Sequence, residues 1–227
     1  MEIKSIHQKI ETELGDLITE YGFKFSSTFS FSQGSGNLYK DSQEVIFRLG
    51  YGIFDCGDYF EIGCGSISIT FPIVERITTS ILVKYGILGD SALNDPITFI
   101  PPNQRKIETM KFNDEVGLTN FINVFRSYFN RDALKLFEEY GEMIKVSDAL
   151  NNIPQKEISN YMPKGLYKKA TIWKLCGNPN YEEYIEWLDT GMTKRAKNDP
   201  GNLEYAKSSD AIKELREKLN NASASIV

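Results

Sequence analysis

Histidine and cysteine are scarce in this sequence, which holds His7 alone and three cysteines, Cys56, Cys64 and Cys176, among 227 residues. A single histidine without a recognisable nucleophile motif gives no basis for a Ser-His-Asp or Cys-His-Asn arrangement, or for a histidine-based zinc site. We therefore expect His7 at the surface or rim of a helix. Three cysteines without a framework spacing indicate reduced thiols and a cytoplasmic location.

Long apolar runs and an excess of positive charge are also missing. No stretch approaches the roughly 18 apolar residues of a membrane span, and residues 1–15 lack the apolar core of a signal peptide. The net charge is −5, so bulk attraction to nucleic acid or to an anionic membrane is not expected. The sequence predicts a cytoplasmic protein that binds neither nucleic acid nor membrane.

Recognisable catalytic motifs are absent as well. The glycine-containing segments "GSGN" and "YGILGDSA" have no Walker-type lysine, and GxSxG, HExxH and kinase signatures do not occur. Asp55, Asp58 and Glu61 stand close together in the sequence, but calcium loops need more oxygen ligands at a tighter spacing. No catalytic residue, cofactor or metal ion is predicted.

What the sequence does contain is clear hydrophobic periodicity. Residues 3–21 carry one apolar stripe at spacings of three and four, which predicts an amphipathic helix capped at Gly22. Residues 23–31 and 45–51 alternate with period two, which predicts antiparallel strands. A third strand is predicted over 59–72, where the parity of the apolar residues switches between Gly63 and Gly65 and a bulge is expected. The intervening "QGSGN" and "DCGD" segments favour turns.

Helical patterns dominate the rest of the chain. Pro72 suits the start of a short helix, and Asn113 or Asp114 suits the cap of a long helix over 115–140, whose apolar stripe begins at Val116. Two helices joined by a short connection, one opening at Pro163, predict an αα-hairpin, and a final helix is expected over 208–220.

This order of elements predicts an α+β fold: an N-terminal helix, an antiparallel β-meander of about three to five strands and a helix-rich C-terminal half with an αα-hairpin. We expect one α+β domain over residues 1–227. Its helix-and-sheet part is expected at 1–112 and its helical part at 113–227.

The alternating phenylalanines of "GFKFSSTFSFSQG" allow two interpretations. A platform that stacks bases or a flat ligand would interleave exposed rings with lysine and arginine, but only Lys24 is basic here. The first helix also needs an apolar partner. We therefore expect Phe23, Phe25, Phe29 and Phe31 in the core, and a polar, serine-rich outer face that is free to dock a partner.

Two further features are candidates for binding. Residues 1–95 hold 13 acidic and 7 basic side chains, so the negative charge is concentrated there. "KGLYKKATIWK" (164–174) carries four lysines, which we interpret as the solvated back of a helix or, alternatively, a small anion-binding patch. Trp187 lies off the apolar stripe of its helix, so we expect it to be more exposed and able to anchor an interface.

The succession of a helix, "EYGFK", alternating strands ending in "ISITFPIVERI", and helices around "LYKKATIWKLCGNPNYEEYIEWL" resembles bacterial domains of unknown function, some of which are toxin-associated immunity proteins. The resemblance implies a non-catalytic protein that binds and blocks another protein. Negative charge would speed its encounter with a basic toxin. The acidic residues on or near the strands are Asp41, Glu44, Asp55, Asp58 and Glu61.

Two other functions remain open from the sequence. One is a scaffold or interaction module that uses the C-terminal helical hairpin and Trp187. The other is a small-ligand-binding protein or an enzyme of unknown type, with the aromatic face as a pocket wall.

Overall fold

The computed structural model describes residues 1–94, 96–105 and 107–222. The chain divides into two compact units, each built from two separate segments. The sheet unit comprises 1–69 and 100–141, and the helical unit comprises 70–99 and 142–227. Each unit therefore draws on both halves of the chain, which is a different division from the one at 112/113 that the order of elements favoured.

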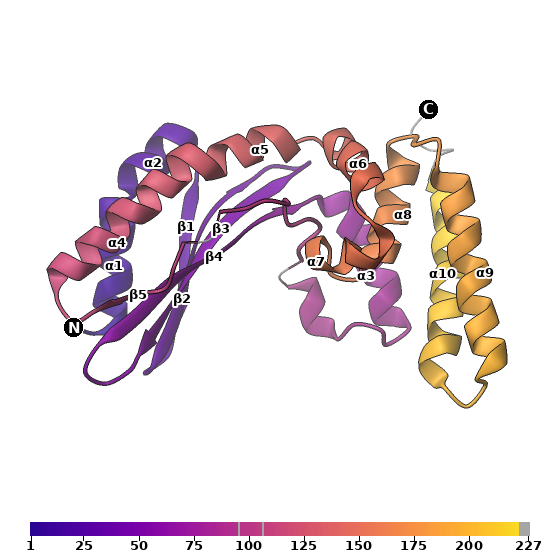
Figure 1. Cartoon of the computed structure of the whole chain (residues 1–227), viewed down its shortest axis with the longest axis horizontal. Coiled ribbons are helices and arrows are strands. Elements are labelled where there is room, and N and C mark those ends of the chain that lie inside the picture. The colour runs from indigo at the N-terminus through magenta and orange to yellow at the C-terminus, as the bar shows by residue number, and fades with distance from the viewer. Residues whose placement is uncertain (95, 106, 223–227) are drawn as a thin grey trace. The chain divides into compact units, whose positions relative to one another are not determined.

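A five-stranded antiparallel meander forms the centre of the sheet unit, with the strands in the order β1-β2-β3-β4-β5 (Figure 1). The α+β prediction is confirmed. Helices from both ends of the unit cover one face of this sheet (Figure 1). The strands are β1 (Lys24–Phe29), β2 (Gln33–Asp41), β3 (Ile46–Asp55), β4 (Phe60–Thr70) and β5 (Met110–Phe112).

The N-terminal segment forms two helices, α1 (Ile3–Glu13) and α2 (Gly15–Tyr21), where the apolar stripe predicted one. Leu14 closes α1 by donating its N–H to Ile10 at 3.0 Å. Glycine is a poor helix former, so the chain can break its helix at Gly15 at little cost. Gly22 takes the left-handed conformation with a φ of 68°, as predicted for the cap.

The segment "QGSGN" lies inside β2, so the prediction of a turn at 33–37 is wrong. Its glycines serve packing: a Cβ atom on Gly34 would collide with the His7 ring, and one on Gly36 would collide with the Tyr51 ring. The reversal takes place just before β2 instead, where Ser30 donates its N–H to the carbonyl of Gln33 at 2.8 Å. The second predicted turn, "DCGD", is confirmed, with Gly57 at a φ of 89°.

A long helical segment covers the sheet and matches the predicted helix at 115–140. It consists of α4 (Glu115–Tyr128), the π-helical turn η2 (Phe129–Ala133) and α5 (Leu134–Tyr140). Asp114 caps it by accepting the N–H of Gly117 at 2.9 Å. Val116 departs from the predicted stripe because it lies in the exposed first turn of α4, where 77% of it is accessible.

The helical unit forms a second core. Its main helices are α3 (Pro72–Lys84), α6 (Met143–Asn152), α8 (Gly165–Leu175), α9 (Tyr181–Asn198) and α10 (Leu203–Ala222), with short turns η1 (Asp90–Leu93), η3 (Gln155–Glu157) and α7 (Ile158–Tyr161). The predicted αα-hairpin is formed by α8 and α9, with Gly177 at a φ of 64° in the connection. The helices α9 and α10 form a second pair and lie side by side (Figure 1).

Candidate binding surfaces

The strand register separates the five predicted acidic residues into two groups. Asp41 pairs with Ile46 at the start of β3, and Glu44 lies in the turn between them. Asp55 ends β3, and Asp58 and Glu61 follow it. Because β3 has ten residues, its two ends lie about 30 Å apart at roughly 3.3 Å per residue. The acids therefore do not form one continuous patch.

Three of these acids already have partners inside the sheet unit. Asp41 pairs with Lys24 at 3.2 Å, and Glu61 pairs with Lys111 at 3.1 Å. Asp55 accepts the N–H of Gly57 at 2.8 Å, which stabilises the turn. Within the described part of the chain, the carboxylates of Glu44 and Asp58 have no hydrogen-bond or ion-pair partner. The negative charge available to a partner is smaller than the sequence suggested.

The phenylalanines of the first strand divide between core and surface, so the prediction that all four are buried is wrong. Phe23 is buried and Phe25 is half-buried. Phe29 is 49% exposed and Phe31 is 98% exposed. Phe31 is exposed because the β1–β2 hairpin is longer than the helix that covers it. The hairpin extends beyond the first turn of α1, so no helix covers Phe31 in the hairpin turn. The outer face of β1 is polar as predicted, and there the Thr28 and Ser35 hydroxyls form a hydrogen bond of 3.0 Å.

A third exposed ring lies at the same end of the sheet, on the face opposite to Phe29. Phe54 is 53% exposed and is the register partner of Gln33, directly after the hairpin turn. Asp55 donates its N–H to the carbonyl of Ser32 at 2.9 Å, which fixes the end of β3 against that turn. We call this surface the hairpin end: Phe29, Phe31, Phe54, Asp55 and Asp58. It borders an open hollow of about 450 Å³ lined by Thr28, Phe29, Ser30, Gln33, Gly34, Ser35, Gly52 and Phe54.

His7 is buried beneath the hairpin end, so the prediction of a surface position is wrong. Only 2% of it is exposed, and its Nδ1 lies 2.7 Å from the Tyr51 hydroxyl oxygen. Its ring stacks on Phe29 with 5.8 Å between centroids. Burial lowers the pKa of His7. Its Nε2 atom has no hydrogen-bond partner among the described residues.

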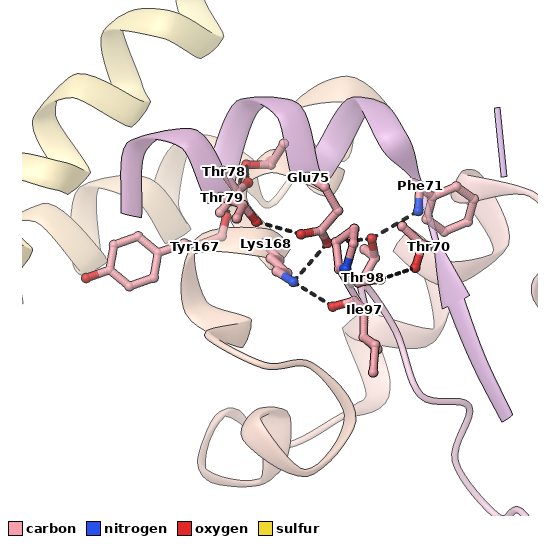
Figure 2. Close-up of polar contacts among 11 residues, drawn as sticks. Thr70, Phe71, Glu75, Thr78, Thr79, Ile97, Thr98, Tyr167 and Lys168 are labelled. Carbon is pink, nitrogen blue, oxygen red and sulfur yellow. Dashed lines mark hydrogen bonds and ion pairs between the residues drawn. The ribbon is translucent and has the colours of Figure 1, made fainter. Parts of the chain in front are cut away.

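Two of the four lysines at 164–174 are buried, so the interpretation as a solvated helix back is wrong for Lys168 and Lys169. Lys168 lies in the helical unit against Glu75 of α3, with 2.8 Å between Nζ and Oε1, and donates to the carbonyl of Ile97 at 2.6 Å (Figure 2). Thr79 and Thr98 each donate to a carboxylate oxygen of Glu75 at 2.6 Å.

This buried polar cluster is satisfied from within the protein. Each carboxylate oxygen of Glu75 accepts at least one hydrogen bond, and Thr98 in turn accepts the N–H of Phe71 at 3.0 Å (Figure 2). Burial lowers the pKa of Lys168, while the Glu75 carboxylate opposes that shift. The cluster joins α3, the segment 96–98 and α8, so we assign it a structural role.

Trp187 is 52% exposed, as its position off the helical stripe predicted. It borders an aromatic groove of about 430 Å³ in the helical unit, lined by Gln155, Trp173, Asn180, Glu183, Tyr184 and Trp187. Lys169 supports this groove: its Nζ lies 4.1 Å from the centroid of the Trp173 ring and donates to the carbonyl of Leu150 at 3.0 Å. Burial lowers the pKa of Lys169 to about 8.

The described residues contain no cluster of three or more His, Cys, Asp or Glu side chains able to hold a metal ion. None of their helices combines the length and apolar character needed to cross a membrane. Comparison of the chain with protein-family models, with curated proteins and with solved structures gave no match.

Proposed function

We propose that this protein is a non-catalytic, protein-binding inhibitor of the immunity type, and that the hairpin end is its contact surface for a basic toxin. The observation that carries the proposal is that three exposed phenylalanines surround one end of the sheet: Phe29 on one face, Phe54 on the other and Phe31 in the turn. Asp55 and Asp58 follow Phe54 at the same end.

Exposed aromatic rings are costly in a free protein, and clustered ones are typical of interfaces. Phe31 makes the strongest case because 98% of it is accessible and it contributes little to the core of the sheet unit. A partner with an apolar pocket would remove these rings from water. Aromatic anchors of this kind supply much of the binding energy in protein complexes.

The carboxylates give the surface its preference for a basic partner. Asp58 has no ion-pair partner within the described residues, and Asp55 uses its carboxylate only to hold the adjacent turn. The net charge of −5 adds a general attraction toward positively charged proteins. Electrostatic complementarity of this kind raises the association rate and falls with added salt. The Asp41 and Glu44 group lies at the opposite end of the sheet and is not part of this contact.

The experiment that tests the proposal is a pull-down of the full chain from its native cytoplasm at low and moderate salt, with mass spectrometry. We expect one stoichiometric basic partner that salt releases. The decisive variants are Phe31→Ala and Asp58→Asn, since both side chains are exposed and the fold should tolerate their loss. Leu203→Ala, at a residue 69% exposed in the helical unit, is the matched control.

Phe31→Ala should lose most of the partner, Asp58→Asn should weaken its capture at low salt, and Leu203→Ala should retain it. The proposal is overturned if the partner persists with Phe31→Ala combined with Phe54→Ala, or if no partner is recovered at either salt concentration.

A second candidate function is a scaffold module that binds through the helical hairpin. It is favoured by the half-exposed Trp187 at the rim of the aromatic groove. Under this alternative Trp187→Ala, and not Phe31→Ala, would abolish capture of the partner.

A further inference from the structure

The aromatic groove of the helical unit offers hydrogen-bond acceptors that have no donor among the described residues. Gln155 donates its Nε2 to the Tyr184 hydroxyl at 3.2 Å, and Asn180 donates its Nδ2 to Asn151 at 3.3 Å. Each amide thus uses one of its two N–H donors on the protein side. Among the described residues, nothing donates to the side-chain oxygens of Gln155 and Asn180 or to the Glu183 carboxylate. A ligand that matches these atoms must be a donor.

Glu183 also carries an uncompensated negative charge. Its neighbours on α9 do not: Glu182 pairs with Lys174 at 3.1 Å, and Glu186 pairs with Arg216 at 2.9 Å. Glu183 lines the groove and has no ion pair in the described part of the chain. The charge of the groove therefore favours a cation.

The rings in this region already bind cations, with one exception. Lys169 lies over Trp173 and Lys174 lies over Tyr181, at 4.1 and 4.5 Å from the ring centroids. Trp187 packs against Tyr184 at 5.6 Å but carries no cation among the described side chains. Trp187 follows Glu183 by four residues on α9, so the two side chains lie on the same face of the helix.

The position of Lys169 determines which aromatic ring of the groove can bind a further cation. Its ammonium group packs on Trp173 and Tyr184 and opposes a second positive charge at those faces. The exposed Trp187 ring, with the Glu183 carboxylate one turn away, is the position where a cation gains attraction from both groups. The groove volume of about 430 Å³ lies within the usual range for ligand sites.

We infer that this groove binds the guanidinium group of an arginine side chain presented by a polypeptide. A guanidinium is planar, always charged and rich in donors, so it can stack on Trp187 while donating to Glu183 and the two amide oxygens. A lysine ammonium would satisfy the charge but not the stacking. The inference does not depend on the hairpin end, which belongs to the other unit.

The test is a two-dimensional NMR titration that follows the two tryptophan indole N–H signals of the full chain. Trp173 is an internal reference because its Nε1 donates to the carbonyl of Ser147 at 3.3 Å. The probe is a capped, glycine-flanked arginine peptide. It should shift the Trp187 signal saturably and the Trp173 signal far less. The same peptide with citrulline, which keeps the shape but lacks the charge, should bind at least about 10-fold more weakly.

Two variants of adjacent glutamates separate this site from general charge attraction. Glu183→Gln should lower the affinity for the arginine peptide about 10-fold. Glu182→Gln removes the same charge outside the groove and should leave that affinity unchanged. The inference is overturned if the peptide does not shift Trp187 at tens of millimolar, if the citrulline peptide binds as well, or if the two variants weaken binding equally.

Discussion

The Nδ1 atom of His7 lies 2.7 Å from the hydroxyl oxygen of Tyr51, a residue 44 positions further along the chain. The contact joins α1 to the centre of β3, and both side chains are buried. Two glycines of β2, Gly34 and Gly36, leave the space that these rings fill. The pair thus ties the first helix to the sheet with a polar contact inside an aromatic environment.

Acid should destabilise the protein through His7. Its pKa is lowered from 6.5 in the folded state by burial, so the unfolded chain binds a proton more readily between the two pKa values. The free energy of unfolding should therefore be highest above about pH 6.5 and fall as the pH drops, by at most about 1.4 kcal/mol per pH unit from this group.

The measurement is urea unfolding over this pH range for the wild type and for His7→Phe, which keeps a ring but cannot take up the proton. Other groups titrate in both proteins, so the difference between the two curves reports His7. The advantage of the wild type in the free energy of unfolding should shrink as the pH falls, and His7→Phe should become the more stable protein if the fall is large enough. Parallel curves would show that His7 does not contribute.

A methyl group at Gly36 should destabilise the sheet unit. The Cβ atom would meet the buried ring of Tyr51, and overpacking of this kind costs about 1–3 kcal/mol. Gly15→Ala is the matched control, because nothing lies within 4 Å of its added Cβ and it occupies the start of α2. That variant should be neutral or more stable by up to about 1 kcal/mol. Equal effects of the two substitutions in urea unfolding would contradict the packing role of Gly36.

Local sequence patterns predicted most of the fold. The errors arose at positions whose structure depends on residues far away in the sequence. The alternation of β1, the caps at Gly22 and Asp114 and the turn at Gly57 depend on neighbouring residues, so the sequence shows them. Gly36 was assigned to a turn because glycine is common both in turns and where a large ring packs on a strand. Its partner ring is Tyr51, which only the strand register identifies.

The binding surfaces were harder to predict for the same reason. The exposure of Trp187 follows from its position on one helix, and that prediction is confirmed. The hairpin end depends on Phe54 meeting the turn near Phe31, which requires the register of three strands. The sequence predicted a solvated position for Lys168 because its partner, Glu75, is on α3, far away in the sequence. No local pattern marks such a pair.

Phe23 and Phe29 should differ in their contributions to stability, although both belong to the same alternating stretch. Phe23 is buried and packs edge-on against Phe129 at 5.1 Å, so Phe23→Ala should cost about 3–5 kcal/mol. Phe29 is half-exposed, so Phe29→Ala should cost about half as much, since the transfer free energy scales with the buried area. Chemical denaturation of both variants checks this, and equal losses would show that Phe29 is buried in solution.

The buried pair of Glu75 and Lys168 should matter far more than a surface pair on the same helix. Lys168→Met leaves the Glu75 carboxylate buried with only hydroxyl donors, and removal of one member of a buried pair costs about 3–5 kcal/mol. Lys84, also on α3, pairs with Glu214 at the surface, and 60% of the Lys84 side chain is exposed. Lys84→Met should therefore cost far less than Lys168→Met.

A double-mutant cycle separates loss of the ion pair from loss of packing. Glu75→Gln with Lys168→Met removes both charges, while a glutamine can still accept from Thr79 or Thr98. The double variant should therefore be more stable than the sum of the single losses predicts, with a coupling of about 1–3 kcal/mol in urea unfolding. Strict additivity would mean that the two charges do not stabilise each other, and that the carbonyl of Ile97 is the main partner of Lys168.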